Sequence, residues 1–342
     1  MTESVAETVS REIHLKSRPV GMPTAENFEL TTVTLPAPQA GQVVVRNLYL
    51  SVDPYMRGRM VDRKSYTPPF RLGEALTGGC VGQVVQANAG PLAVGDYVLG
   101  MQGWREYYLS DGKGLTRIDP TLAPLPAFLG IAGMPGLTAY VGLLDIGQVK
   151  AGETVFVSAA AGAVGATVCQ IAKIKGCTVI GSAGADDKVA WLLNEAGVDA
   201  AFNYKKVDDL RAELAKHCPN GVDVYFDNVG GDHLEAALDR MNNYGRLVMC
   251  GMIAQYNATE STPAPRNLGL IVGKRLRMQG FIVSDHVARQ PQFFADLREW
   301  IASGQLTWQE TIYQGIEKTP QAFLSLFTGQ NFGKMLVKVG PV

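Results

Sequence analysis

The 342-residue chain is long enough for two domains with sizeable cores, or for one large domain. Its 31 basic and 32 acidic side chains nearly cancel, so nothing in the charge points to nucleic acid as a partner or to a charged, disordered tail. The longest apolar stretch, residues 155–168, is too short and too rich in glycine and alanine to span a bilayer. The N-terminus shows no apolar core of a signal peptide, and we expect a cytoplasmic protein without membrane contacts.

Up to about residue 130 the sequence predicts strands separated by turn residues. Runs rich in β-branched side chains indicate strands at 42–50, 80–85 and 96–99, and proline and glycine bound these runs. Near the C-terminus, residues 333–339 also have a strand pattern. We expect all of them in one β-rich domain, to which the chain returns at its C-terminal end.

In the middle of the chain the patterns of strand and helix alternate. Helical periodicity occurs at 188–196 and 233–241, between apolar runs that are typical of buried strands. Six such runs are present, at 155–158, 178–180, 201–203, 222–226, 246–250 and 278–283. This alternation predicts an α/β fold with a doubly wound parallel sheet. We place this domain at 131–304, inserted between the two parts of the β-rich domain at 1–130 and 305–342.

The first of these strands leads into a loop of small residues at 159–165, which reads AAAGAVG, and then into a helix. A glycine at 162 lets the backbone approach a phosphate closely, and a glycine at 165 lets the helix lie against its strand. Ala160 stands where the common dinucleotide motif has its first glycine. We interpret the unit as a cradle for the pyrophosphate of a dinucleotide, with a strand–turn–helix that binds nothing as the alternative.

The residues after the second strand of this domain indicate which dinucleotide is bound. An NAD site needs an acid there for the ribose 2′-hydroxyl, whereas residues 181–184 read GSAG and the first acids are Asp186 and Asp187. Lys188 follows, a cation that can meet a 2′-phosphate or can simply be a solvated residue of a first helical turn. The missing acid and the lysine together favour NADPH as the cofactor.

Neither cysteine nor histidine spacing indicates a metal site. The five cysteines include no close pair, and the sequence has no C-x-x-C and no H-x-x-H pattern. We therefore expect each of the four histidines on the surface or in a loop, and we expect no bound metal.

Five further strings are specific enough to indicate a family. They are residues 51–60 (SVDPYMRGRM), 133–140 (GMPGLTAY), 226–231 (FDNVGG), 250–257 (CGMIAQYN) and 331–334 (NFGK). Together with the order of domains, they resemble the zinc-independent branch of the medium-chain dehydrogenase/reductase superfamily. That branch contains prostaglandin reductases (leukotriene B4 12-hydroxydehydrogenases), plant alkenal double-bond reductases and bacterial curcumin reductases, the last being the most similar. The G-H-E of the zinc branch is absent, because residues 73–75 read GEA.

The resemblance implies a GroES-like catalytic domain, a Rossmann domain and a homodimer. It also implies NADPH-dependent reduction of the C=C bond of α,β-unsaturated ketones and aldehydes. The residues implied at the pyrophosphate are Gly162, Ala163, Val164 and Gly165, and those implied at the 2′-phosphate are Lys188 and Tyr204. The residues implied around the ribose, the nicotinamide and its carboxamide are Asn228, Cys250, Tyr256, Asn331, Phe281, Ile282, Val283, Met134 and Thr138.

Reduction of an enone places negative charge on the carbonyl oxygen of the substrate. Without a metal, this charge must be met by hydroxyls, backbone N–H groups or the ribose of the cofactor. Tyr256 and Tyr55 are the candidate catalytic residues, although a tyrosine is commonly a packing residue. We interpret Cys250 as a pocket wall rather than a nucleophile. Arg57 and Arg59 could steer an anionic substrate or could be solvated loop charges.

Three alternatives stay open at this point. An NADPH quinone reductase would share the fold and the cofactor, and an alcohol dehydrogenase would need the zinc ligands that the sequence lacks. A dinucleotide-binding redox sensor or scaffold would bind NADPH without turning over a substrate.

Overall fold

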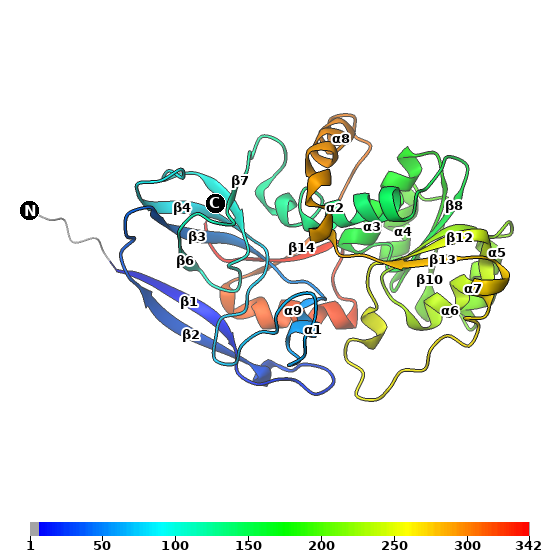
Figure 1. Ribbon diagram of the computed structural model, residues 1–342, viewed down its shortest axis with the longest axis horizontal. Helices are drawn as coiled ribbons and strands as arrows, with labels where there is room; N and C mark the ends of the chain where they lie inside the picture. The colour runs from blue at the N-terminus through cyan, green and yellow to red at the C-terminus, as the bar shows by residue number, and fades with distance from the viewer. Residues whose placement is uncertain (1–6, 342) are drawn as a thin grey trace, which may run out of the picture. The chain divides into compact units, whose positions relative to one another are not determined.

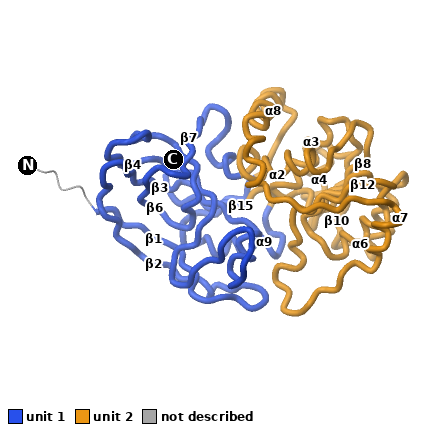
Figure 2. Tube along the Cα trace, in the orientation of Figure 1, with its two compact units in different colours: residues 1–129, 310–331, 335–342 blue, residues 130–309, 332–334 orange. Residues whose placement is uncertain are grey.

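The computed structural model describes residues 7–341, and Figure 1 shows the order of their helices and strands. The chain forms two compact units, which Figure 2 distinguishes by colour. Unit 1 contains the residues up to 129 together with 310–331 and 335 onward, and unit 2 contains 130–309 and 332–334. The chain therefore leaves unit 1 once to build the main part of unit 2, and a short C-terminal segment adds to unit 2 again.

Unit 1 is rich in β-strands. Among the described residues its main sheet has seven strands, in the order β14-β15-β3-β4-β5-β7 with β6 paired to β3. These strands are β3 (Gln42–Ser51), β4 (Cys80–Asn88), β5 (Tyr97–Gly100), β6 (Tyr107–Ser110), β7 (Thr116–Arg117), β14 (Glu310–Gln314) and β15 (Lys334–Lys338). A separate antiparallel pair consists of β1 (Thr8–Leu15) and β2 (Phe28–Leu35). The predicted strands at 42–50, 80–85, 96–99 and 333–339 correspond to β3, β4, β5 and β15, whereas the sequence analysis does not predict β1 and β2.

The core of unit 1 is apolar and aromatic. The side chains of Val44 and Leu50 on β3 are fully buried. Three rings, those of Phe28, Trp104 and Phe323, meet with their centroids 5.8 to 6.2 Å apart. Aromatic pairs of this kind add about 0.5–1.5 kcal/mol each beyond the area they bury. The α-helices in the described part of unit 1 are α1 (Met56–Arg59) and α9 (Thr319–Thr328).

Unit 2 contains a sheet of six strands within the described residues, and every neighbouring pair of these strands is parallel. The strand order is β10-β9-β8-β11-β12-β13. The strands are β8 (Thr154–Val157), β9 (Thr178–Ala183), β10 (Ala200–Asn203), β11 (Val222–Asp227), β12 (Met241–Met249) and β13 (Arg277–Gly280). Numbered along the chain, this is the 3-2-1-4-5-6 order of a Rossmann sheet, which reverses between β8 and β11. The predicted doubly wound α/β fold is confirmed.

All six predicted strands are present; β8 and β12 end one residue earlier than predicted, and β13 ends three residues earlier. The apolar run at 278–283 predicts a strand through Val283, whereas β13 ends at Gly280 and a 3-10 helix begins at Val283. Residues 281–283 are half-buried outside the sheet. An apolar run reports burial and not backbone conformation, so it cannot locate the end of a strand by itself.

Helices cover both faces of the parallel sheet (Figure 1). They are α2 (Met134–Val141), α3 (Ala163–Ile174), α4 (Asp186–Asn194), α5 (Leu210–His217), α6 (Gly231–Arg240), α7 (Leu270–Gly273) and α8 (Gln290–Ala302). Helix α2 contacts α3 and α8, whereas α6 contacts α5 and α7. The predicted helices at 188–196 and 233–241 correspond to α4 and α6, which each begin two residues earlier. No helix within residues 7–341 is long and apolar enough to cross a membrane.

Stacked rings form part of the core of unit 2. Phe156 of β8 stacks on Tyr225 of β11 at 5.1 Å and on Phe202 of β10 at 6.2 Å between ring centroids. Leu214 of α5 and Leu234 of α6 belong to the same buried cluster. The two helices are therefore packed on the strands whose carboxyl ends carry the predicted site.

Candidate functional site

The loop between β8 and α3 has the geometry of a backbone cradle. Gly162 precedes α3 in an extended conformation (φ −81°, ψ 172°), and within the described residues no side chain caps the helix there. Ala163 and Val164 form the half-buried first turn, where backbone N–H groups have no partner inside the helix and can bind an anion. A Cβ at Gly165 would overlap the carbonyl oxygen of Ala159, so only glycine lets the helix lie this close to the loop.

A segment from the C-terminal part of the chain lies against this cradle. The N–H of Gly333 donates to the carbonyl oxygen of Ala161 at 3.0 Å, and Gly333 pairs with Gly162 in an isolated parallel bridge. Residues 332–334 thus form one wall of the cradle in unit 2. Asn331, a predicted cofactor residue, directly precedes this segment and belongs to unit 1.

Asn228 follows β11 and is fixed by Ser158 at the end of β8. Its Nδ2 donates to the carbonyl oxygen of Ser158 at 2.8 Å, and its backbone N–H donates to the Ser158 hydroxyl at 3.0 Å. Both hydrogen bonds join the two strands between which the strand order reverses. Open α/β sheets bind their ligands at this reversal, so Asn228 stands where a ligand is expected.

Asp227, the last residue of β11, is a site residue that no sequence motif singles out. Its Oδ1 accepts hydrogen bonds from the backbone N–H groups of Val229 and Gly230, both at 2.8 Å, and from the Tyr225 hydroxyl at 2.7 Å. The side chain is fully buried, and this burial raises the pKa of Asp227. Asp227 thus fixes the turn at 228–230. The sequence signal for this role is an acid at the end of a buried strand, directly before Asn228.

Cys250 and Tyr256 meet the same turn from the end of β12. The backbone N–H groups of Cys250 and Gly251 donate to the carbonyl oxygen of Asp227 at 2.9 and 3.0 Å. The Tyr256 hydroxyl accepts from the N–H of Met252 at 3.3 Å, and a Cβ at Gly251 would lie 3.2 Å from its oxygen. Burial raises the pKa of Cys250 to about 12, so its thiol stays protonated, which suits a pocket wall rather than a nucleophile.

Lys188 and Tyr204 lie near the carboxyl ends of β9 and β10. Tyr204 directly follows β10, and a Cβ at Gly184 would lie 3.1 Å from the Tyr204 hydroxyl oxygen and 3.2 Å from Lys205 Cε. Lys188 is in the first turn of α4, where it is half-buried, and burial lowers its pKa. The sequence analysis does not single out Lys205, because no motif spacing includes it.

The expectation that every histidine is on the surface or in a loop is wrong for His233. This residue lies on α6, its side chain is 5% exposed, and its ring meets that of Tyr204 edge-on with centroids 4.9 Å apart. Burial lowers the pKa of His233 to about 4, so the ring is neutral near pH 7. Histidine spacing reports on metal ligands only, whereas the helical period places His233 with Leu234 and Ala237 on the buried face of α6.

The residues after β13 contact the end of α2. A Cβ at Gly142, which follows α2, would lie 2.7 Å from Cζ of Phe281, so the ring covers this glycine. Ile282 and Val283 continue the segment and are half-buried. This close approach joins two predicted parts of the nicotinamide pocket within unit 2.

Helix α2 carries the predicted residues Met134 and Thr138. Thr138 is buried, and its hydroxyl donates to the carbonyl oxygen of Met134 at 2.7 Å. The Met134 side chain is exposed. The exposed Met134 side chain offers apolar surface to a ligand. The Thr138 hydroxyl, in contrast, is hydrogen-bonded to the backbone of its own helix.

Tyr55 belongs to unit 1, where it directly precedes α1. Its half-buried side chain packs against the core of that unit. Burial raises the pKa of Tyr55, and the nearby Asp53 carboxylate raises it further. The hydroxyl therefore keeps its proton at any physiological pH.

Arg57 and Arg59 hold the fold of unit 1 together. Arg57 is buried and donates to the carbonyl oxygen of Gly21 at 2.8 Å. Arg59 donates to the carbonyl oxygens of Pro68 and Thr77 at 3.0 and 3.2 Å. Both guanidinium groups thus bind loop backbone, and Arg57 is buried rather than solvated.

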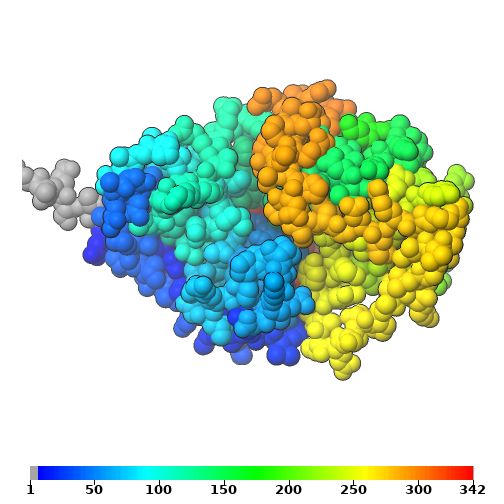
Figure 3. Space-filling model, viewed as in Figure 1, coloured from blue at the N-terminus to red at the C-terminus, as the bar shows by residue number. Residues whose placement is uncertain are grey.

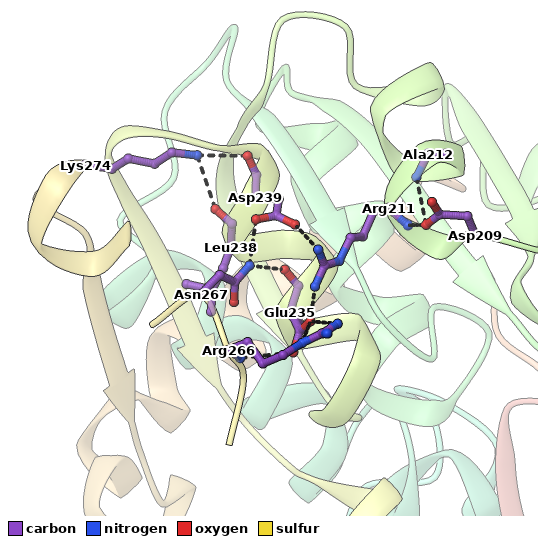
Figure 4. Close-up of polar contacts among 9 residues, drawn as sticks. All are labelled: Asp209, Arg211, Ala212, Glu235, Leu238, Asp239, Arg266, Asn267 and Lys274. Atoms are coloured by element: carbon purple, nitrogen blue, oxygen red, sulfur yellow. Dashed lines mark hydrogen bonds and ion pairs between the residues drawn. The ribbon is translucent and has the colours of Figure 1, made fainter. Parts of the chain in front are cut away.

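The loop at 258–267 is anchored to α6 by charged side chains (Figure 4). Glu235 accepts hydrogen bonds from the Arg266 backbone at 3.1 Å and from its guanidinium at 3.0 Å, and Arg211 pairs with the same carboxylate. Asn267 Nδ2 donates to the carbonyl oxygen of Glu235 at 2.8 Å. Most of the loop is exposed, and Figure 3 shows it in yellow on the surface. Asn267 Nδ2 also donates to Asp239 Oδ1 at 2.7 Å, so α6 holds the C-terminal end of the loop, and the Glu235 carboxylate is the partner of Arg266.

Two family models match the chain. One, described as the N-terminal domain of oxidoreductase, matches residues 11–118 in unit 1. The other, described as zinc-binding dehydrogenase, matches residues 163–303 in unit 2. Over residues 7–341, no group of three histidine, cysteine, aspartate or glutamate side chains could hold a metal ion.

Known proteins resemble the chain over nearly its whole length. The NADPH-dependent curcumin reductase of Escherichia coli is 44% identical over 330 residues, which are 95% of this chain and 95% of that protein. The NADP(+)-dependent 2-alkenal reductase of Nicotiana tabacum is 44% identical over 343 residues, covering 98% of this chain and 99% of its own. The crystal structure of CurA from Vibrio vulnificus in complex with NADPH has a TM-score of 0.92 and 45% identity, and covers 97% and 100% of the two chains.

Proposed function

The chain belongs to the medium-chain dehydrogenase/reductase superfamily, in the branch of the curcumin and 2-alkenal reductases, and we propose that it is an NADPH-dependent double-bond reductase. Its substrates are α,β-unsaturated ketones and aldehydes, and the bond reduced is the C=C bond. The observation that carries the proposal is the open cradle between β8 and α3, in a chain 45% identical to a protein solved with NADPH.

The residues along the carboxyl edge of the parallel sheet suit this cofactor. Gly165 lets α3 begin close to the loop, because a Cβ there would overlap the Ala159 carbonyl oxygen, and the N–H groups of residues 163–165 can bind a pyrophosphate at the start of the helix. No acid stands at the carboxyl end of β9, where Ala183 and Gly184 follow Ser182, and the first acids, Asp186 and Asp187, already belong to α4. Lys188 and Tyr204 lie near that end. A lysine and a hydroxyl suit a 2′-phosphate better than a 2′-hydroxyl.

The remaining predicted residues are assigned to the ribose and nicotinamide end of the cofactor. Asn228 is held in place by Ser158, and Cys250 lies against the same turn. The full set is Asn228, Cys250, Tyr256, Phe281, Ile282, Val283, Met134, Thr138 and Asn331. When bound, NADPH supplies the hydride that adds to the β-carbon of the substrate, and a proton added at the α-carbon completes the saturated product.

Tyr256 is assigned to the charge that develops on the carbonyl oxygen of the substrate. Its hydroxyl accepts a hydrogen bond from the Met252 N–H, and a hydroxyl polarised in this way is a stronger donor to an oxyanion. Tyr55 is assigned to the substrate side of unit 1, where its raised pKa keeps the hydroxyl a donor. Both tyrosines act by holding hydrogen bonds, and neither needs to lose its proton.

The experiment that tests the proposal is a screen of NADPH oxidation, followed by absorbance, against enals, enones, curcumin-like dienones and a benzoquinone. We expect oxidation that depends on the enone, at least about tenfold faster with NADPH than with NADH at limiting cofactor. Oxidation with the quinone alone would identify a quinone reductase instead. NADPH binding without turnover of any acceptor would identify a sensor or scaffold, and equal use of NADH would remove the roles of Lys188 and Tyr204.

Four further properties belong to the same proposal. Residues 131–304 bind the cofactor together with Asn331, residues 1–130 and 305–342 supply the substrate side, the enzyme is a homodimer, and no zinc takes part. All five cysteines are free thiols, which supports a reducing compartment such as the cytoplasm. Light scattering tests the dimer, and enone reduction after chelation tests the independence from zinc.

A further inference from the structure

A lysine that the proposed function does not use lies beside Gly184. Lys205 belongs to the 3-10 turn Tyr204–Lys206, and its backbone N–H donates to Asn203 Oδ1 at 3.1 Å. A Cβ at Gly184 would lie 3.2 Å from Lys205 Cε and 3.1 Å from the Tyr204 hydroxyl oxygen. The bare backbone of Gly184 is therefore the surface on which both side chains lie, and a larger residue there would displace them.

The lysines around this glycine differ in their partners. Lys206 pairs with the carboxylate of Asp186, which also accepts from Asn203 Nδ2 at 2.7 Å. Within residues 7–341, Lys205 makes no ion pair with an acidic side chain. Burial lowers the pKa of Lys188, the Asp187 carboxylate raises it, and the positive charge of Lys205 lowers it, so the two ammonium groups are close enough to repel each other. An anion bound by both would relieve this repulsion.

The aromatic neighbour of Lys205 is also held in place. The ring of Tyr204 rests edge-on against the buried ring of His233, with centroids 4.9 Å apart. His233 is neutral near pH 7 and adds no charge that could compete for the anion. The Tyr204 hydroxyl and the Lys205 amine therefore approach the same glycine from a fixed turn, as two donors for one group.

We propose that Lys205 is a second cation for the 2′-phosphate of NADPH, acting with Lys188 and the Tyr204 hydroxyl, and that it sets the preference for NADPH over NADH. This inference rests on the proposed function, since it takes NADPH as the cofactor. A phosphate monoester carries close to two negative charges at neutral pH, so two lysines match it better than one. Lys205 acts on the adenosine end of the cofactor and takes no part in the transfer of hydride.

The test uses the full-length chain and two probes that differ only in the phosphate, 2′,5′-ADP and 5′-ADP, with calorimetry as the readout. The variants are Lys205→Gln, Lys205→Arg and the control Lys216→Gln, which removes one charge from an exposed lysine on α5. We expect the wild-type protein to bind 2′,5′-ADP at least about tenfold tighter than 5′-ADP. In Lys205→Gln the ratio of the two dissociation constants should fall about tenfold. Lys205→Arg and Lys216→Gln should keep the wild-type ratio.

Steady-state kinetics provide a second readout. Lys205→Gln should raise KM for NADPH about tenfold and leave KM for NADH and kcat within about twofold. A wild-type preference for 2′,5′-ADP that persists unchanged in Lys205→Gln would overturn the role of Lys205 and leave the proposed function intact. No preference in the wild-type protein would overturn the assignment of NADPH together with this inference.

Discussion

Replacing His233 by leucine should flatten the pH dependence of the protein's stability below pH 6.5. In the unfolded chain the ring has its ordinary pKa of 6.5, and burial in the folded protein lowers this pKa to about 4. Between these values the unfolded chain binds a proton that the folded protein excludes, so stability is intact above pH 6.5 and falls as the pH drops toward 4. The full difference in pKa corresponds to about 3 kcal/mol, of which about 2 kcal/mol is lost between pH 7 and pH 5.

The assay is equilibrium unfolding in urea, followed by circular dichroism at pH 7 and pH 5. Because the other titrating groups are common to both proteins, the wild type should lose about 2 kcal/mol more unfolding free energy than His233→Leu over this interval. The control His286→Leu removes a histidine that is not buried and should lose as much as the wild type. Equal losses in wild type and His233→Leu, or an NMR titration of His233 near pH 6.5, would refute the reasoning.

Three further substitutions test the site. Gly165→Ala would overlap the carbonyl oxygen of Ala159, and we expect α3 to move and the affinity for NADPH, measured by calorimetry, to fall at least about tenfold. Tyr256→Phe should lower kcat for enone reduction about tenfold, equivalent to about 1.4 kcal/mol, with KM for NADPH within about twofold. Glu235→Gln should release the charged anchor of the loop at 258–267, and limited digestion with trypsin should cut after Arg266 several times faster.

Each of these substitutions has a matched control in the same unit. Gly273→Ala adds a methyl group to open space and should leave the affinity for NADPH unchanged. Tyr244→Phe removes an exposed hydroxyl and should leave kcat unchanged, and Glu213→Gln breaks an ion pair on α5 without touching the loop. If a control behaves like its test variant, the effect is general destabilisation and the assigned role is wrong.

The fold of unit 2 is predictable because its central strands are buried on both faces. Central strands such as β8 and β11 read as continuous apolar runs, and glycine-rich turns and helical periods separate them. β1 and β2 escape prediction because Ser10 and Glu12 occupy buried positions of β1 and only Phe28 is buried in β2, so neither segment shows the apolar alternation of a half-buried strand. The predicted end of β13 is too late in the chain. Phe281 is an apolar residue that packs against Gly142, and it is not part of the sheet.

The predictable part of the candidate site is the part defined by backbone geometry. The loop at 159–165 can be predicted from the sequence because the turn that it forms requires glycine at fixed positions. The roles of Asp227, His233 and Lys205 cannot be predicted in this way. They depend on contacts with residues distant in the chain, or with a turn that only the folded structure shows. Burial shifts the pKa of the first two, upward for Asp227 and downward for His233, and no motif spacing reports the burial of a single polar side chain.

The most direct test of the central claim is the position of deuterium in the product formed from an enone and NADPH deuterated at C4 of the nicotinamide, with both C4 stereoisomers used. The account predicts a saturated ketone that carries deuterium on its β-carbon and retains its carbonyl group. Deuterium on a carbinol carbon, in an allylic alcohol that keeps its C=C bond, would contradict the account and identify a carbonyl reductase.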